Sequence, residues 1–293
     1  MELLNTLYNL MGLVFVLGTI CSMGLSLTMQ QITGPLRDAR FVIVALLANF
    51  VVPPILAFLL IRTFSLDETL AVGLLLVSLA AGAPALPKTA VFAKVDTATA
   101  TGLMVLLVVV TIIVLPIALP LLLTGISVTF WDIASGLVYL ILIPLAVSLF
   151  VRARYPDAAA SAQPLFAQAS NLSLLFLLVL MVVLNFSDVV GLFGSGGLLA
   201  SLILVILTTA GGYLLGTLGK ADGWIQALGA GQRNIAAAMV VATMNFGNDE
   251  VVMVVVYSLI VMVILIPLAL ELGKRAKAAA AESPTPESAA VDM

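Results

Sequence analysis

The sequence predicts an all-α polytopic membrane protein, on three observations. Hydrophobic residues make up 62% of the 293 residues and charged residues 9%, whereas about 25% of a soluble domain is charged. About nine apolar runs are long enough to cross a bilayer, which takes roughly 20 residues each. The cations gather in alternate connections between those runs, as the positive-inside rule requires.

The nine runs lie near residues 6–29, 38–62, 68–95, 97–123, 131–152, 166–187, 195–219, 222–246 and 249–273. Two of them are interrupted, the third by the stretch Gly82 to Pro87 and the eighth by the stretch Gly229 to Asn234. Gly and Pro end or break helices. We therefore expect two broken helices, with new half-helices starting near Leu86 and Ile235. The first run has no basic segment before it, so we interpret it as a retained helix rather than a secretory signal.

Nine crossings place the termini on opposite sides of the membrane. One set of connections and the C-terminal segment hold nine of the 12 cations: Arg37, Arg40, Lys94, Arg152, Arg154, Lys220, Lys274, Arg275 and Lys277. The other set holds Arg62, and the remaining two cations lie inside runs. The expected location is the cell inner membrane or plasma membrane, with the N-terminus outside and the C-terminus in the cytoplasm.

The chain contains two similar stretches. Val114-Leu115-Pro116-Ile117-Ala118-Leu119 and Leu265-Ile266-Pro267-Leu268-Ala269-Leu270 each close an apolar run that follows a broken helix and a polar turn. This pattern favours an inverted repeat, about 1–125 and about 126–275, within one transmembrane domain of residues 1–275. Chance similarity between apolar segments is the alternative. Residues 276–293 have the composition of a disordered cytoplasmic tail.

Lys88 and Arg233 lie at the two breaks, and no acidic residue in the apolar runs is available to pair with either. A cation within a membrane is a functional hypothesis by default, and half-helix N-termini attract anions. We therefore expect an anion-binding site there, in the manner of secondary transporters whose broken helices meet at the midplane.

Four polar residues complete the expected site: Gln232, Asn234, Thr89 and, from the second run, Asn49. Other roles remain open. Lys88 could extend its side chain to the cytoplasmic headgroups, which is less feasible for Arg233. Asn49 could serve only as an interhelical hydrogen-bonding residue.

Several classes of function are excluded or disfavoured. Cys21 is the single cysteine and histidine is absent, so a disulfide framework, a thiolate metal cage and imidazole catalysis are excluded. No acid pair or nucleophile–base pair predicts an enzyme, and no ring of charges predicts a channel. We expect no metal, no cofactor and no nucleic-acid partner, but membrane lipid and a small organic anion.

Three motifs, in order along nearly the whole chain to about residue 272, resemble the bile acid:sodium symporter family. They are Met23-Gly24-Leu25-Ser26-Leu27, the broken helix followed by Ala93-Lys94-Val95-Asp96, and the Gly-x-Gln-Asn-like element at 231–234. The resemblance implies a panel domain beside a core domain in which the two broken helices cross. It implies a nine-helix variant of ten-helix relatives, and transport of bile acids or other organic anions, usually with sodium.

The chain departs from the family at the sodium ligands. The family's Ser and Asn of the first break align with Leu86 and Pro87, or in another register with Thr89 and Ala90. In the second break, Gly229 stands where the family has Glu and Arg233 where it has Gln, while Asn234 is retained. The resemblance therefore implies that most sodium ligands are missing.

These observations together predict a secondary transporter for a small organic anion. A carboxylate or sulfonate would suit a positive site, and an amphipathic one would suit the apolar surroundings. We expect sodium-independent transport by alternating access, with Lys88 and Arg233 replacing sodium, although the coupling ion (none, proton or sodium) stays open. The alternatives are a sodium-coupled organic anion symporter and a membrane sensor that binds an anion without moving it.

Overall fold

The computed structural model of the chain describes residues 2–34, 37–123, 128–184 and 194–282, and within them it contains helices and no strand. Six helical segments are long and apolar enough to cross a membrane: Thr6–Ser26, Ala39–Phe64, Thr97–Leu122, Phe130–Arg154, Gly197–Leu218 and Glu250–Ala278. They correspond to the first, second, fourth, fifth, seventh and ninth predicted runs. The predicted class, an all-helical protein with membrane-spanning helices, is confirmed.

The third and eighth predicted runs are divided as expected. The third forms α5 (Glu68–Leu79) and α6 (Leu86–Ala93), and the eighth forms α13 (Gly223–Gly231) and α14 (Ile235–Asn245). Both new half-helices start at the predicted residues, Leu86 and Ile235. The sixth run forms α10 (Pro156–Leu184), and its predicted end at 187 lies outside the described residues.

One group of helices, which we call the α1 group, is built on α1 (Glu2–Ser26) and α10. It also contains α8 (Phe130–Leu137), the π-helical turn η2 (Val138–Leu142) and α9 (Ile143–Arg154). Glycines let α1 approach its neighbours: a Cβ at Gly18 would lie 3.0 Å from the Phe166 carbonyl oxygen of α10. The Thr19 hydroxyl bonds to that of Ser170 across the same contact. Small residues and shared hydroxyls are the usual means of close helix packing in lipid.

The other group, the broken-helix group, contains α5, α6, α13 and α14. Around them pack α3 (Ala39–Phe50), α4 (Val52–Phe64), α7 (Thr97–Leu122), α12 (Gly197–Leu218) and α15 (Asn248–Glu282). The short helix α2 (Met29–Thr33) joins α1 to this group and packs on α7. The two groups meet where α14 and α7 contact α8 and where α1 contacts α14.

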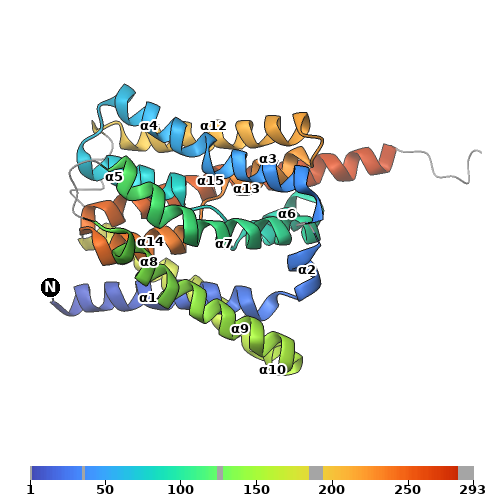
Figure 1. Ribbon diagram of the computed structural model, residues 1–293, viewed down its shortest axis with the longest axis horizontal. Helices are drawn as coiled ribbons and strands as arrows, with labels where there is room; N and C mark the ends of the chain where they lie inside the picture. The colour runs from blue at the N-terminus through green and yellow to red at the C-terminus, as the bar shows by residue number, and fades with distance from the viewer. Residues whose placement is uncertain (1, 35–36, 124–127, 185–193, 283–293) are drawn as a thin grey trace, which may run out of the picture.

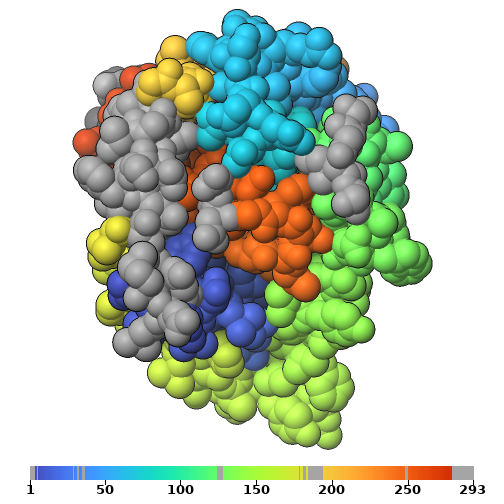
Figure 2. Space-filling view, turned by 90° about the vertical axis from the view of Figure 1, so that its left-hand side faces the viewer, coloured from blue at the N-terminus to red at the C-terminus, as the bar shows by residue number. Residues whose placement is uncertain are grey.

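The two broken helices run in opposite directions: in Figure 1, α5 to α6 proceeds from left to right and α13 to α14 from right to left. The N-terminus lies at the left end, whereas α15 finishes at the right end (Figure 1). Figure 2 looks onto the left end, where the cyan surface of α4 and α5 is above, the orange surface of α14 and α15 central, and α1 and α10 below.

Helix α15 continues to Glu282, so the predicted start of the tail at 276 is too early. An exposed ion pair between Arg275 and Glu271, 2.9 Å apart at i and i+4, and the four alanines at 278–281 both favour a continued helix. Residues 283–293 of the predicted tail lie outside the described residues.

Candidate functional site

The first break, residues 80–85, keeps its backbone hydrogen-bonded although it lies in the protein interior. The Thr111 hydroxyl of α7 accepts from the Ala81 N–H (2.9 Å) and donates to the Ala81 carbonyl (3.0 Å). Gly82 has a φ of 83°, and a Cβ there would lie 2.5 Å from the Val108 backbone nitrogen. Only glycine fits this left-handed turn against α7.

The second break, residues 232–234, is shorter and is joined to the first. The Asn234 N–H donates to the Ala80 carbonyl at 2.8 Å. The Asn234 side-chain oxygen accepts from the Ala237 N–H at 3.0 Å and so caps α14. This cap explains why the half-helix starts at Ile235. The two breaks therefore lie in direct contact within the broken-helix group.

Arg233 is 2% exposed, and all five of its N–H groups donate to oxygen atoms. Nε donates to the Val77 carbonyl (2.9 Å), and Nη1 to the Asn49 side-chain oxygen and the Ala230 carbonyl (3.4 Å each). Nη2 donates to the backbone carbonyls of Asn49 (3.1 Å) and Ser78. Every one of the five oxygens is neutral. We call them the oxygen cage.

The backbone carbonyls of the oxygen cage belong to the last turns of three helices. Asn49 lies near the end of α3, Val77 and Ser78 near the end of α5, and Ala230 near the end of α13. Carbonyls in a last turn lack helical partners, and the helix dipole makes that end negative. The guanidinium is therefore stabilised by three helix C-termini, without a carboxylate within ion-pair distance among the described residues.

Two further predicted residues meet beside the oxygen cage. Gln232 Nε2 donates to the Thr89 hydroxyl at 2.7 Å, which links α6 to the second break. Gly231 packs so closely on α12 that a Cβ would lie 2.2 Å from the Thr209 hydroxyl. Thr89, Gln232, Asn234 and Asn49 are all buried, as is Arg233. Five of the six predicted site residues are thus brought together at the two breaks.

Lys88 is placed differently. It is exposed on α6, as is Val91, whereas Leu86, Thr89, Ala90 and Ala93 form the buried face. That buried face packs against α7, α13 and α15. The expectation that Lys88 faces the same interior as Arg233 therefore needs correction, because the rotation of α6 is set by its apolar face. Its ammonium has no hydrogen-bond or ion-pair partner among the described residues.

Sequence reasoning missed several residues. The carbonyls of Val77, Ser78 and Ala230 carry no side-chain signal, so no pattern could identify them. Tyr257 of α15 is fully buried and, with respect to the described residues, its hydroxyl has no hydrogen-bond partner. The sequence did contain a sign of it, since this tyrosine is a polar residue within the apolar ninth run.

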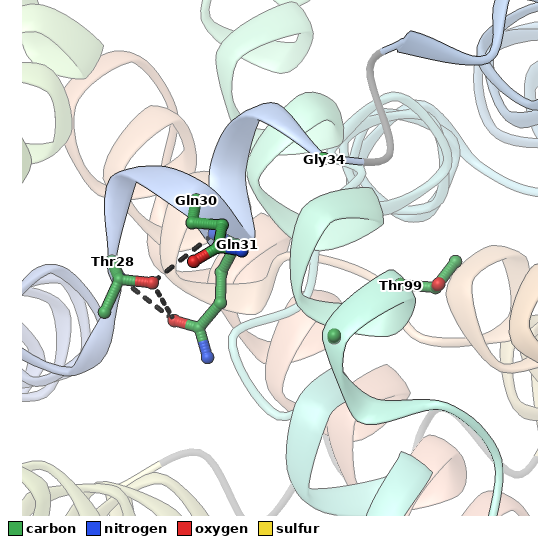
Figure 3. Close-up of a pocket in the computed structure, with 6 residues that line it drawn as sticks. Thr28, Gln30, Gln31, Gly34 and Thr99 are labelled. Atoms are coloured by element: carbon green, nitrogen blue, oxygen red, sulfur yellow. Dashed lines mark hydrogen bonds between the residues drawn. The ribbon is translucent and has the colours of Figure 1, made fainter.

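Two cavities lie near the contacts between the groups. The first, about 550 Å³, lies between α2 and the start of α7 and is lined by Thr28, Gln30, Gln31, Gly34, Ala98 and Thr99. Figure 3 shows Gln31 bonded to Thr28 on one wall and Thr99 across from them. The second, about 370 Å³, lies between α1, η2, α10 and α14. No cluster of three or more metal-ligating side chains is present in the described part of the chain.

A family model described as the Sodium Bile acid symporter family matches residues 11–192, well over half of the chain. The chain belongs to the Sodium Bile acid symporter family. The match includes the first break and ends before the second. No curated protein matches the chain.

Membership of the Sodium Bile acid symporter family implies a transporter, typically of bile acids or other organic anions. The membrane-spanning helices agree with a multi-pass membrane protein. Arg233 lies outside the segment matched by the family model. The oxygen cage around its guanidinium is therefore a feature of this structure rather than an inference from the family.

Proposed function

We propose that the protein is a secondary transporter that moves a small organic anion by alternating access, without sodium, and that fixed cations take the place of the sodium ion. The observation that carries this proposal is the oxygen cage. Neutral carbonyl and amide oxygens are the ligands expected around a hard monovalent cation. Here the guanidinium of Arg233 occupies the place of that cation.

An arginine is well suited to this role. Its guanidinium is permanently charged, and its five donors are held in a fixed planar arrangement. Because all five donors are already engaged by the cage, none is free for a substrate. Arg233 would therefore act as the cation, and the anion would be held by other groups.

Lys88 is the cation available for the anion. It lies in the first turn of α6, whose N-terminus has no side-chain cap. A partly positive helix end and a free ammonium both favour a carboxylate or sulfonate. Without a coupling ion, the carrier would be a uniporter or an anion exchanger.

The opposite directions of the two broken helices support the proposed inverted repeat and, with it, a nine-crossing arrangement. We assign the end at which α6, α12 and α15 finish to the cytoplasm. Those ends carry Lys94, Lys220 and the cations at 274–277, whereas Arg62 lies near the end of α4, on the opposite side (Figure 1). Alternating access would follow from movement of the α1 group against the broken-helix group.

The test is uptake of a labelled alkylsulfonate into proteoliposomes that contain the purified protein. We expect uptake and counterflow that are unchanged when an inward sodium gradient is replaced by choline. Empty liposomes and liposomes with the Arg233→Gln variant are the controls. Strong stimulation of wild-type uptake by sodium would instead indicate a sodium-coupled symporter.

A membrane sensor is the remaining alternative. It would bind the same anion, as measured by a rise in unfolding temperature, but would give no counterflow of that anion in proteoliposomes. Counterflow measured on the same preparation therefore separates the two functions.

A further inference from the structure

Helix α10 runs beside the membrane-spanning segment of α1. The Gln163 amide donates to the Ser22 hydroxyl at 2.9 Å, and the Ser170 hydroxyl donates to the Phe15 carbonyl at 3.2 Å. Phe15 lies next to the midpoint of the segment Thr6–Ser26. The residues of α10 around Ser170 therefore lie near the middle of the membrane.

The exposed face of α10 carries two amide side chains at this depth. Ser170, Ser173 and Leu177 are buried, whereas Gln168 and Asn171 are exposed, and neither amide has a hydrogen-bond partner among the described residues. An amide in hydrocarbon without a partner is costly. In Figure 1 the labelled parts of α9 and α10 form the lower edge of the molecule, away from the broken-helix group. The two amides therefore indicate a lipid-facing surface that a further helix would cover.

The exposed residues of α10 also follow a heptad spacing. Ser161, Pro164, Gln168, Asn171 and Leu175 succeed one another at intervals of three, four, three and four residues, and all five are exposed. This spacing places them in one stripe, as in helices that pack as a left-handed pair, and most helix pairs in membranes have this hand. We call these five residues the α10 seam. A single asparagine in such a stripe can fix both the register and the number of helices that associate.

The chemistry of the α10 seam fits a second copy of the same chain. Copies of one chain insert with the same orientation, because the charges of their connections set it. A twofold axis along the membrane normal therefore brings two α10 helices together in parallel, and each residue of the seam then faces its own counterpart. An amide is both a donor and an acceptor, so it can pair with an identical amide, whereas two identical charged side chains would repel each other.

We propose that the protein forms a twofold dimer in the membrane through the α10 seam, in which Gln168 and Asn171 each hydrogen-bond to the same residue of the second copy. Because α10 belongs to the α1 group, this dimer joins the two α1 groups and leaves both broken-helix groups on the outside. Each broken-helix group could then move against a joined pair of α1 groups.

Cross-linking between copies tests the position of the interface. In a Cys21→Ser background, Leu175→Cys introduces a cysteine in the α10 seam, and Phe176→Cys introduces one at the next residue, on another face of α10. The two native side chains are 58% and 57% exposed, so they form a matched pair. The purified full chain is reconstituted in liposomes and oxidised with copper phenanthroline. We expect a cross-linked dimer for Leu175→Cys and little or none for Phe176→Cys, because a disulfide needs Cβ atoms about 4 Å apart that point toward each other.

Removal of the amides tests the hydrogen bonds. The double variant Gln168→Leu/Asn171→Leu should fold, since both side chains are exposed and leucine is favourable in lipid. Its dimer dissociation constant in liposomes should be about tenfold higher than that of wild type. The measurement is energy transfer between fluorophores attached to the C-terminus, at several protein-to-lipid ratios. Asn9→Leu removes an exposed amide from α1 instead and should leave the dissociation constant unchanged.

Three results would each overturn the inference. The first is a wild type that is monomeric at every protein-to-lipid ratio. The second is equal cross-linking of Leu175→Cys and Phe176→Cys, which would indicate random collision or a different interface. The third is a double variant that associates as tightly as wild type. None of these results would bear on anion transport, which the uptake assay measures separately.

Discussion

The two breaks differ in how each uses its polar groups. The first, residues 80–85, has no polar side chain. A hydroxyl from α7 bonds to the N–H and carbonyl of Ala81, and a backbone N–H from the second break bonds to the Ala80 carbonyl. The second, residues 232–234, consists of three polar residues whose side chains form hydrogen bonds to α6, α3 and α14. The first break therefore depends on its surroundings, whereas the second supplies its own partners.

The cations show the same contrast. Arg233 is buried with all of its donors occupied, and Lys88 is exposed and free of partners among the described residues. A buried cation that is fully bonded is structural and electrostatic in its role, whereas a free cation can still bind a ligand. Similar positions in the two broken helices thus hold cations in different surroundings.

Replacement of Arg233 should produce the largest effect. Arg233→Ala leaves five buried oxygens without donors, at about 1–3 kcal/mol for each that stays unsatisfied. We expect a large fall in the unfolding temperature of the purified protein. Because the cage is suited to a small cation, sodium chloride should raise the unfolding temperature of this variant.

The control for this experiment is choline chloride, because the choline cation is too large for the cage. Wild type should not respond to either salt, since its cage is filled. Equal unfolding temperatures of Arg233→Ala in sodium and choline would show that the cage does not bind a free cation.

Replacement of Lys88 should strongly reduce anion transport and leave the fold intact. In a Cys21→Ser background, Lys88→Cys should lower hexanesulfonate uptake about tenfold or more, which corresponds to the loss of a charged hydrogen bond. Modification with aminoethyl methanethiosulfonate restores a positive charge and should restore uptake. Sulfonatoethyl methanethiosulfonate adds a negative charge and should not. Full uptake by unmodified Lys88→Cys would mean that the lysine only reaches the headgroups.

Thr111 tests the dependence of the first break on α7. Thr111→Val removes both hydrogen bonds to Ala81 at a side chain that is 1% exposed, and should lower the free energy of unfolding by about 1–3 kcal/mol. Thr101→Val is the matched control, because that buried hydroxyl bonds only to a carbonyl of its own helix, that of Thr97. Similar losses for the two variants would contradict a special role of Thr111.

The smallest effect is expected at the turn after α6. Asp96 caps α7, and hydrogen bonds from the side chain and backbone of Thr99 lower the pKa of its carboxyl group. Asp96→Ala should cost about 1 kcal/mol of stability at pH 7. Because the folded-state pKa is depressed, this difference should persist down to about pH 4 and diminish as the pH falls further. Asp96→Asn keeps a cap without a charge, so its stability relative to Asp96→Ala should not vary over this pH range.

The sequence was sufficient to predict the helical class and both breaks. Gly82, Pro84 and Pro87 interrupt an apolar run in a way that only a broken helix accommodates, and Asn234 before Ile235 is a typical helix start. The end of α15 was placed too early because composition does not separate a solvated helix from a disordered tail.

The candidate site was predicted only in part. Asn49, Thr89, Gln232 and Asn234 were identified because buried polar residues in membrane helices need partners. Whether Lys88 faces the interior or the surroundings was left open, since eight residues of α6 contain too little apolar pattern to fix the rotation of the helix. The oxygen cage consists mainly of backbone carbonyls, which every residue carries, so its position depends on tertiary structure alone.

The covalent attachment of Arg233 has an electrical consequence. A dissolved ion crosses the membrane with its cargo and is released there, but a guanidinium returns with the protein. If the protein works as a uniporter rather than an exchanger, a monoanion therefore crosses as an uncompensated negative charge. An inside-negative membrane voltage of 100 mV would favour its exit from the cell by about 2.3 kcal/mol, so that voltage alone would make this carrier an exporter.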